Sequence, residues 1–182
     1  MSADSCLTLD LVISGMSEND RLQTAWQELL LAWLTALHPD LPPKLSHSGY
    51  SVGLTFCDDA TIAALNQEWR GKDCPTDVLA FAAQEVLPEE IPSPRPLPQE
   101  QLELGDIVVS LDTAARQALE HVHGVEEEVR FLVCHGLLHL LGWDHPDEAS
   151  LAAMLAKQAD LLSDTAHLQQ VTTEPCDRES RG

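Results

Sequence analysis

The chain has 182 residues, of which 30 are acidic and 10 are basic, so its formal net charge at pH 7 is −20. This length suits one domain with a substantial core, and the strong negative charge argues against a broad nucleic-acid-binding surface, which is normally basic. No run of apolar residues approaches the ~18 that a membrane span requires.

The beginning of the chain and its cysteines favour a cytoplasmic protein. Residues 1–6 contain no basic segment followed by an apolar run, which argues against a signal peptide. The five cysteines are scattered and odd in number, which favours reduced thiols over a disulfide framework. We therefore expect a cytoplasmic protein that has no membrane partner and does not bind DNA.

The first half of the chain is predicted to alternate strands and helices. Apolar spacing indicates, in order, a strand over 7–13, a helix from Ser17 to a stop near Pro39, a strand over 50–56, a helix from Asp58 or Asp59 to Trp69, and a short strand over 77–81. Residues 84–104 contain five prolines and five acids, which predicts an irregular loop.

The second half is predicted to be mainly helical. A strand over 105–110 precedes three helices, over 112–121 with Asp112 as its cap, over 125–141 and over 147–162. Residues 164–182 are predicted to form a disordered acidic tail, which leaves 1–163 as a single catalytic domain. The order of elements lacks regular βαβ alternation, so we predict an α+β fold in which about five helices pack on a small mixed four-stranded sheet.

Three histidines at i, i+4 and i+10 form the most informative pattern in the chain. His135 and His139 lie one helical turn apart on the same face, with side chains about 6 Å apart. Gly142 can adopt the left-handed conformation that ends a helix, so the chain can turn and bring His145 to the same point. Three nitrogen ligands with an open fourth position are typical of catalytic zinc. We therefore predict one zinc ion per chain, held by these histidines.

The same spacing occurs in metzincin peptidases, whose pattern is H-E-x-x-H-x-x-G-x-x-H. The glutamate that serves those enzymes as general base is Gly136 in this chain. A glycine cannot accept a proton, so the pattern retains the metal ligands and lacks the peptidase base.

A second group of polar residues lies near the end of the predicted helix that stops at Trp69. Arg70 and Lys72 are two of only ten basic residues, and Thr76 and Asp77 follow closely. The planar guanidinium of an arginine suits the recognition of phosphate. Taken alone, the cluster is more typical of a solvated turn with surface ion pairs.

Together, these segments resemble the YbeY family of bacterial metal-dependent endoribonucleases. The matching stretches are residues 65–81, 104–107 and 135–145, with Gly136 as the most specific position, and Ala80 departs from the serine that is usual in the family. The resemblance implies single-strand-specific cleavage of ribosomal RNA, chiefly near the 3′ end of the small-subunit RNA, and a role in ribosome quality control. The implied partners are ribosomal RNA and the small ribosomal subunit.

The resemblance also implies roles for individual residues. His135, His139 and His145 would hold the metal, and Arg70 and His135 would act in catalysis. The metal would activate a water or polarise a phosphoryl oxygen, while the arginine would stabilise negative charge in the transition state. The sequence does not identify a general base, and Asp144 is expected to orient a histidine or cap the turn.

Two alternatives remain open at this point. The first is a metallopeptidase-like hydrolase, which the metzincin spacing supports and the glycine at position 136 opposes. The second is a non-enzymatic ribosome-associated factor with a structural zinc. That reading requires a fourth protein ligand, for which Cys134 and Asp144 are the candidates.

Overall fold

The computed structural model describes residues 6–16, 19–85 and 101–168. Its strands and longer helices are, in chain order, β1 (Thr8–Ser14), α1 (Asp20–Leu37), β2 (Gly49–Cys57), α2 (Asp59–Arg70), β3 (Val78–Ala82), β4 (Leu102–Ser110), α3 (Leu111–His121), α4 (Val125–Leu140) and α5 (Glu148–Asp164). Short 3₁₀ helices span His38–Asp40, Ala83–Glu85 and Ala166–Leu168. The predicted order of strands and helices is confirmed.

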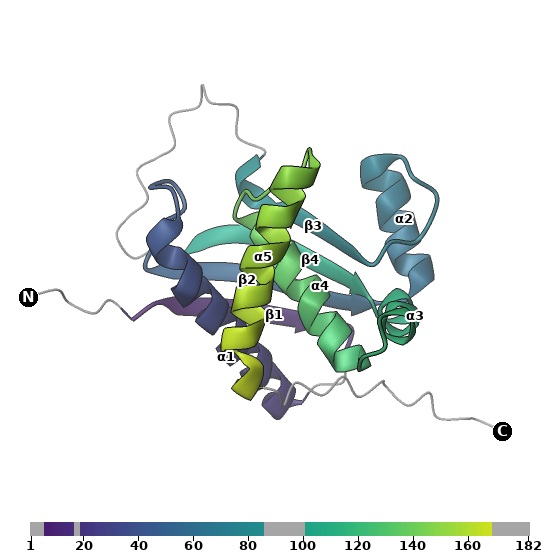
Figure 1. Ribbon diagram of the computed structural model, residues 1–182, viewed down its shortest axis with the longest axis horizontal. Coiled ribbons are helices and arrows are strands. Elements are labelled where there is room, and N and C mark those ends of the chain that lie inside the picture. The colour runs from purple at the N-terminus through teal and green to yellow at the C-terminus, as the bar shows by residue number, and fades with distance from the viewer. Residues whose placement is uncertain (1–5, 17–18, 86–100, 169–182) are drawn as a thin grey trace, which may run out of the picture.

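The four strands form one mixed sheet in the order β1-β2-β4-β3. β1 pairs in parallel with β2, and β2 pairs in parallel with β4. β3 runs antiparallel to β4 and lies at the edge of the sheet (Figure 1). The predicted α+β class, with a small mixed sheet in a single domain, is confirmed.

The two faces of the sheet carry different amounts of apolar packing. The main core lies on the face covered by α1, α4 and α5, and it includes Trp26 and Trp33 of α1 and Leu137 of α4 (Figure 1). The opposite face has a smaller cluster, in which Ile62 of α2 packs against Leu79 and Val108 of the sheet. Since α4 contacts β3 and β4 on one side and α5 on the other, its position in the fold is strongly fixed.

The start of α1 differs from the prediction. The helix begins at Asp20, and the side chain of Asn19 accepts a hydrogen bond of 3.0 Å from the backbone nitrogen of Arg21. Asn19 is therefore the cap, whereas Ser17 lies outside the described residues. Asparagine and serine are comparable N-caps, so composition alone did not separate the two positions.

The caps of α2 and α3 are partly as predicted. Asp58 caps α2 by accepting from the nitrogen of Thr61 at 2.8 Å. Ser110, not Asp112, caps α3, since its side chain accepts from the nitrogen of Thr113 at 3.2 Å. The carboxylate of Asp112 instead accepts from the backbone nitrogen of Asp59, a contact between α2 and α3 that only the fold creates.

Two predicted boundaries also shift. β4 begins at Leu102, because this residue pairs with Tyr50 and so brings the end of the expected 84–104 loop into the sheet. Residues 86–100 of that loop lie outside the described residues. At the carboxyl end, α5 continues to Asp164, and Thr165 is only 5% exposed.

Regular structure therefore extends to Leu168, and the remainder of the expected tail lies outside the described residues. The division of the chain at residue 163 stays a prediction. The four cysteines in the described ranges are free thiols, and no described helix has the length and apolar character needed to cross a membrane.

Candidate metal centre

The histidine helix and the turn after it bring the three predicted ligands together. α4 ends at Leu140, and Gly142 has a φ of +90°, the left-handed conformation that glycine adopts without strain. The Gly142 nitrogen donates to the carbonyl of His139 at 3.0 Å, so the chain reverses at once. His145 is thereby returned to the face of α4 that carries His135, as the sequence predicted.

The geometry of this cluster suits one metal ion. One ring nitrogen from each of His135, His139 and His145 lies within 4.8 Å of the others. The Nε2 atoms of His135 and His139 are 3.1 Å apart. Two nitrogens bound tetrahedrally to zinc at about 2.0–2.1 Å would be separated by roughly 3.3–3.4 Å. The described residues therefore bring three nitrogens close to the spacing of a three-ligand metal site.

Gln158 of α5 fixes the orientation of one ligand, and the sequence analysis did not identify it. This fully buried residue donates from Nε2 to the carbonyl of Phe131 at 2.8 Å, which leaves its Oε1 free to accept. The Nδ1 of His135 lies 3.1 Å from that oxygen and must therefore carry the proton. The Nε2 lone pair of His135 is then available for a metal, an arrangement common among metal-binding histidines.

A sequence signal for Gln158 did exist. Met154, Gln158 and Leu161 occupy the i, i+4 and i+7 positions of the buried face of α5. A polar residue in the middle of an apolar stripe requires a buried hydrogen-bonding partner.

The electrostatic environment favours the neutral form of two of the ligands. Burial lowers the pKa of His135. Burial also lowers the pKa of His139, and the neighbouring His135 and His145 lower it further. Both shifts favour the neutral ring, the state in which an imidazole binds a metal.

Gly136 is favoured by close packing as well as being the position that lacks the peptidase base. A Cβ atom at this residue would lie 2.8 Å from Cγ2 of Ile107 and 3.4 Å from Cγ2 of Val78. α4 thus approaches β4 so closely that a side chain here would meet that of Ile107. A glutamate at this position would require Ile107 to shift, so the packing disfavours the protease pattern.

The histidines and Arg70 line one cavity of about 640 Å³. The other residues that line it include Thr76, Asp77, Val78, Ala80, Phe131, Gly136, Trp143 and Asp144. The predicted association of the arginine segment with the histidine segment is therefore present in the structure. Lys72, the other basic residue of the sequence cluster, does not line this cavity.

The end of α2 determines where Arg70 lies. Gly71 ends the helix, and its nitrogen donates to the carbonyl of Gln67 at 3.1 Å. The buried side chain of Asn66 donates to the carbonyl of Cys74 at 2.9 Å, which holds the following loop against the helix. Arg70 is exposed at this junction, so its charge is available to a ligand.

Neither candidate for a fourth protein ligand joins the cluster. Cys134 is fully buried in the main core, and burial raises the pKa of its thiol to about 12. The Oδ1 of Asp144 accepts from the nitrogen of His145 at 2.8 Å, so this residue caps the turn, one of the two roles expected for it. In the described chain the metal-binding group at this site consists of the three histidines.

The fold and this site define a single-domain α+β protein with a three-histidine centre beside an arginine. The family model described as Endoribonuclease YbeY matches residues 13–166. The chain therefore belongs to the YbeY family of endoribonucleases, and the resemblance seen in the sequence is confirmed.

Individual relatives agree with this assignment. The Endoribonuclease YbeY of Synechococcus sp. strain RCC307 is 57% identical over 168 residues, which cover 91% of this chain and 99% of the relative. The Endoribonuclease YbeY of Synechococcus sp. strain CC9311 is 49% identical over 174 residues, which cover 86% of this chain and 95% of the relative. The solution structure of TM1509 from Thermotoga maritima has a TM-score of 0.57 at 24% identity, covering 94% of this chain and 100% of that one, and is similar in fold.

Proposed function

We propose that this protein is a zinc-dependent endoribonuclease that cleaves single-stranded ribosomal RNA near the 3′ end of the small-subunit RNA. It would act in the cytoplasm, with ribosomal RNA and the small ribosomal subunit as partners, and would contribute to ribosome quality control. The observation that carries the proposal is that Arg70 and the three-histidine cluster line the same cavity. The names of the relatives support RNA as the substrate.

His135, His139 and His145 would hold the zinc. A bound zinc ion supplies Lewis-acid polarisation of a phosphoryl oxygen, which lowers the barrier to cleavage of a phosphodiester. Gln158 acts on this centre by keeping the proton of His135 on Nδ1, which orients its Nε2 toward the other two rings.

Arg70 provides the positive charge that an RNA phosphate needs in this acidic protein. Its guanidinium can donate two parallel hydrogen bonds to phosphate oxygens and so stabilise charge that develops in the transition state. Binding through this local site is consistent with the net charge of −20, which does not favour a broad basic surface.

The peptidase alternative has less support. Its general base would occupy position 136, where a side chain would be too close to Ile107 unless that residue shifts. The alternative of a structural zinc is also weaker, since Cys134 and Asp144 have other environments.

A comparison of two variants tests the proposal. Arg70→Ala should leave zinc content and melting temperature nearly unchanged and lower the rate of RNA cleavage on the order of 100-fold or more. His139→Ala should lose both zinc and activity. Arg70→Lys should recover only part of the rate, because an ammonium retains the charge and loses the planar pair of donors.

The matched control is Arg21→Ala, which removes an exposed arginine on α1, away from the cavity. Each protein is assayed on single-stranded ribosomal RNA and on casein, with and without a chelator. Cleavage of RNA by Arg70→Ala at the wild-type rate would remove the catalytic role of this residue. Chelator-sensitive cleavage of casein alone would favour the peptidase.

A further inference from the structure

A second group of metal-binding side chains lies where α3 meets α4, outside the three-histidine centre. His121 is the last residue of α3, His123 lies in the connection, and Glu128 is in the first part of α4. Oε2 of Glu128 is 3.0 Å from Nδ1 of His121 and 2.9 Å from Nε2 of His123. The two imidazole rings stack with their centroids 5.5 Å apart. Three potential ligand atoms thus converge on one point.

Glu128 is the unusual member of this group. Its carboxylate is 1% exposed, and a buried carboxylate is costly unless a cation compensates its charge. Among the described residues its ion-pair partners are the two histidines, which are cations only when protonated. The nearby Arg130 donates instead to the carbonyl of Thr165 at 3.0 Å. Within the described ranges, no permanently charged basic side chain pairs with this buried carboxylate.

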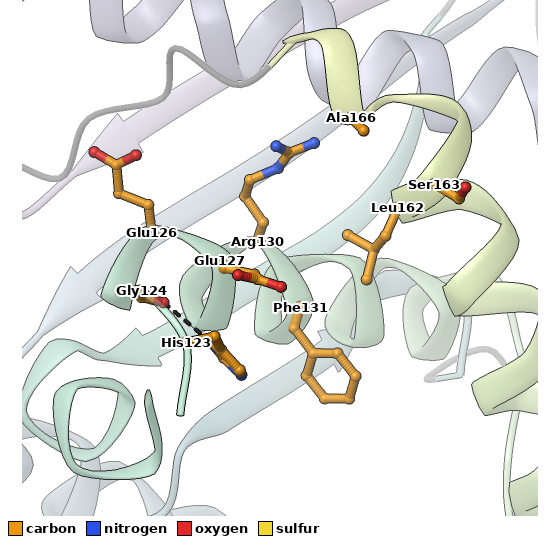
Figure 2. Close-up of a pocket in the computed structure, with 9 residues that line it drawn as sticks. All are labelled: His123, Gly124, Glu126, Glu127, Arg130, Phe131, Leu162, Ser163 and Ala166. Carbon is orange, nitrogen blue, oxygen red and sulfur yellow. Dashed lines mark hydrogen bonds between the residues drawn. The ribbon is translucent and has the colours of Figure 1, made fainter. Parts of the chain in front are cut away.

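The contacts of His123 indicate how that charge is compensated. Its Nδ1 lies 3.1 Å from the carbonyl oxygen of Gly124, drawn as a dashed line in Figure 2, and its Nε2 faces the Glu128 carboxylate. Both neighbours are hydrogen-bond acceptors, so a neutral ring leaves one nitrogen with its lone pair against an oxygen. A second proton on His123 alone would give each oxygen a donor and place one cation against the carboxylate. A metal ion between Nε2 and the carboxylate satisfies the same contacts with both rings neutral.

We propose that His121, His123 and Glu128 form a second divalent-metal site, selective for zinc-like transition metals. Two imidazoles and one carboxylate are a known ligand set for zinc. Nδ1 of His123 would then donate to the Gly124 carbonyl, the backbone contact that commonly orients a metal-binding histidine. This site is distinct from the catalytic one, and its existence does not depend on the proposed ribonuclease activity.

The backbone between the two histidines supports the proposal. Val122 has a φ of +59°, and it is the one non-glycine residue with positive φ in the described ranges. A β-branched residue in this region is strained by about 1–3 kcal/mol, and such strain persists only where surrounding contacts require it. Here the turn at Val122 directs His121 and His123 to the same carboxylate oxygen.

The site also has a route to solvent. His123 lines a cavity of about 500 Å³ at the start of α4, together with Glu126, Glu127 and Phe131 (Figure 2). Two acidic side chains and one basic side chain, Arg130, line this cavity, and the net negative charge favours cations. An ion bound there would connect the end of α3 to α4, the helix that carries His135 and His139.

The test uses metal-stripped protein titrated with zinc against a chromophoric competitor. Wild-type protein should bind two equivalents, and His139→Ala, which removes the first centre, should retain one. Adding His121→Ala to that variant should weaken the binding of the remaining zinc ion at least about 100-fold. Loss of a metal ligand should cost at least as much affinity as loss of a residue that only hydrogen-bonds to a ligand. His167→Ala removes an exposed histidine elsewhere and should leave both equivalents.

Glu128→Gln is a second variant for this test, because an amide has the size of the carboxylate and a much lower affinity for metal ions. Zinc should raise the melting temperature of His139→Ala, and this rise should disappear when His121→Ala or Glu128→Gln is added. If wild-type protein binds only one equivalent and His139→Ala binds none, the second site does not exist. Protonated histidines would then be the only compensation for the buried carboxylate.

Discussion

Replacing Gly136 with alanine tests whether the contact between α4 and the sheet determines this residue. The added Cβ would lie 2.8 Å from Cγ2 of Ile107 and 3.3 Å from its Cγ1. Overpacking of this kind costs about 1–3 kcal/mol. Alanine also favours a helix by about 1 kcal/mol relative to glycine, so the expected net loss in the free energy of unfolding is about 0–2 kcal/mol. This corresponds to a melting temperature lower by up to roughly 8 °C.

The free energy of unfolding is measured with urea at a fixed zinc concentration. It is compared among the wild-type protein, Gly136→Ala, Ile107→Ala and the double variant. Ile107→Ala removes both atoms that meet the new Cβ most closely. In its background, Gly136→Ala should be neutral or stabilising, because only the helix propensity remains. A single variant Gly136→Ala that is more stable than wild type by about 1 kcal/mol would show that the helix can move away from the sheet and that the steric argument is wrong.

Three further outcomes are expected. Gln158→Ala should weaken zinc binding at the three-histidine centre by about 10–100-fold, because His135 loses the partner that fixes its proton. Competition titration measures this affinity, and an unchanged value would contradict the role of Gln158. Hydrogen bonds, chiefly from Ser110, lower the pKa of Asp59 from 3.8 to about 2, so its stabilising contribution is complete above pH 4 and lost as pH falls through 2. Asp59→Asn should therefore flatten the dependence of the unfolding free energy on pH between 4 and 2. If the variant kept the same slope as the wild-type protein, the Asp59 carboxylate would not make this contribution. Thr165→Val should cost about 1–3 kcal/mol of unfolding free energy, because Trp33 loses its acceptor; an unaffected midpoint would show that the chain beyond residue 163 contributes little.

The sequence predicted those features that depend on local spacing. The histidines at 135 and 139 are one helical turn apart in any helix, and Gly142 permits the reversal that returns His145. Alternating and helical periodicity likewise predicted the four strands and five α-helices of the described ranges, because each buries one apolar face.

Features that depend on contacts between distant segments were missed. Gln158 meets His135 only because α5 packs across α4, and Asp112 binds α2 only because the two helices are adjacent. The packing role of Gly136 is likewise visible only when Ile107 is placed beneath it. The association of Arg70 with the histidines was expected only through the family resemblance, because no local spacing connects residues so far apart.

The three histidines lie on backbone that differs in how closely it is packed. His135 and His139 lie on α4, which is packed between the sheet and α5, so the amides of this helix should exchange with solvent only through global unfolding. His145 follows the helix, on a turn where Gly142 and Asp144 are exposed. Trp143 of the same turn packs against the core, so the part that can open without loss of core contacts is the segment that follows it, which carries His145.

We therefore expect zinc to enter and leave the centre through motion of the turn that carries His145, with the other two ligands in place. The rate of metal exchange and the rate of unfolding would then be independent properties of the protein. A substitution that stiffens the turn would slow metal release without changing the melting temperature of the metal-free chain.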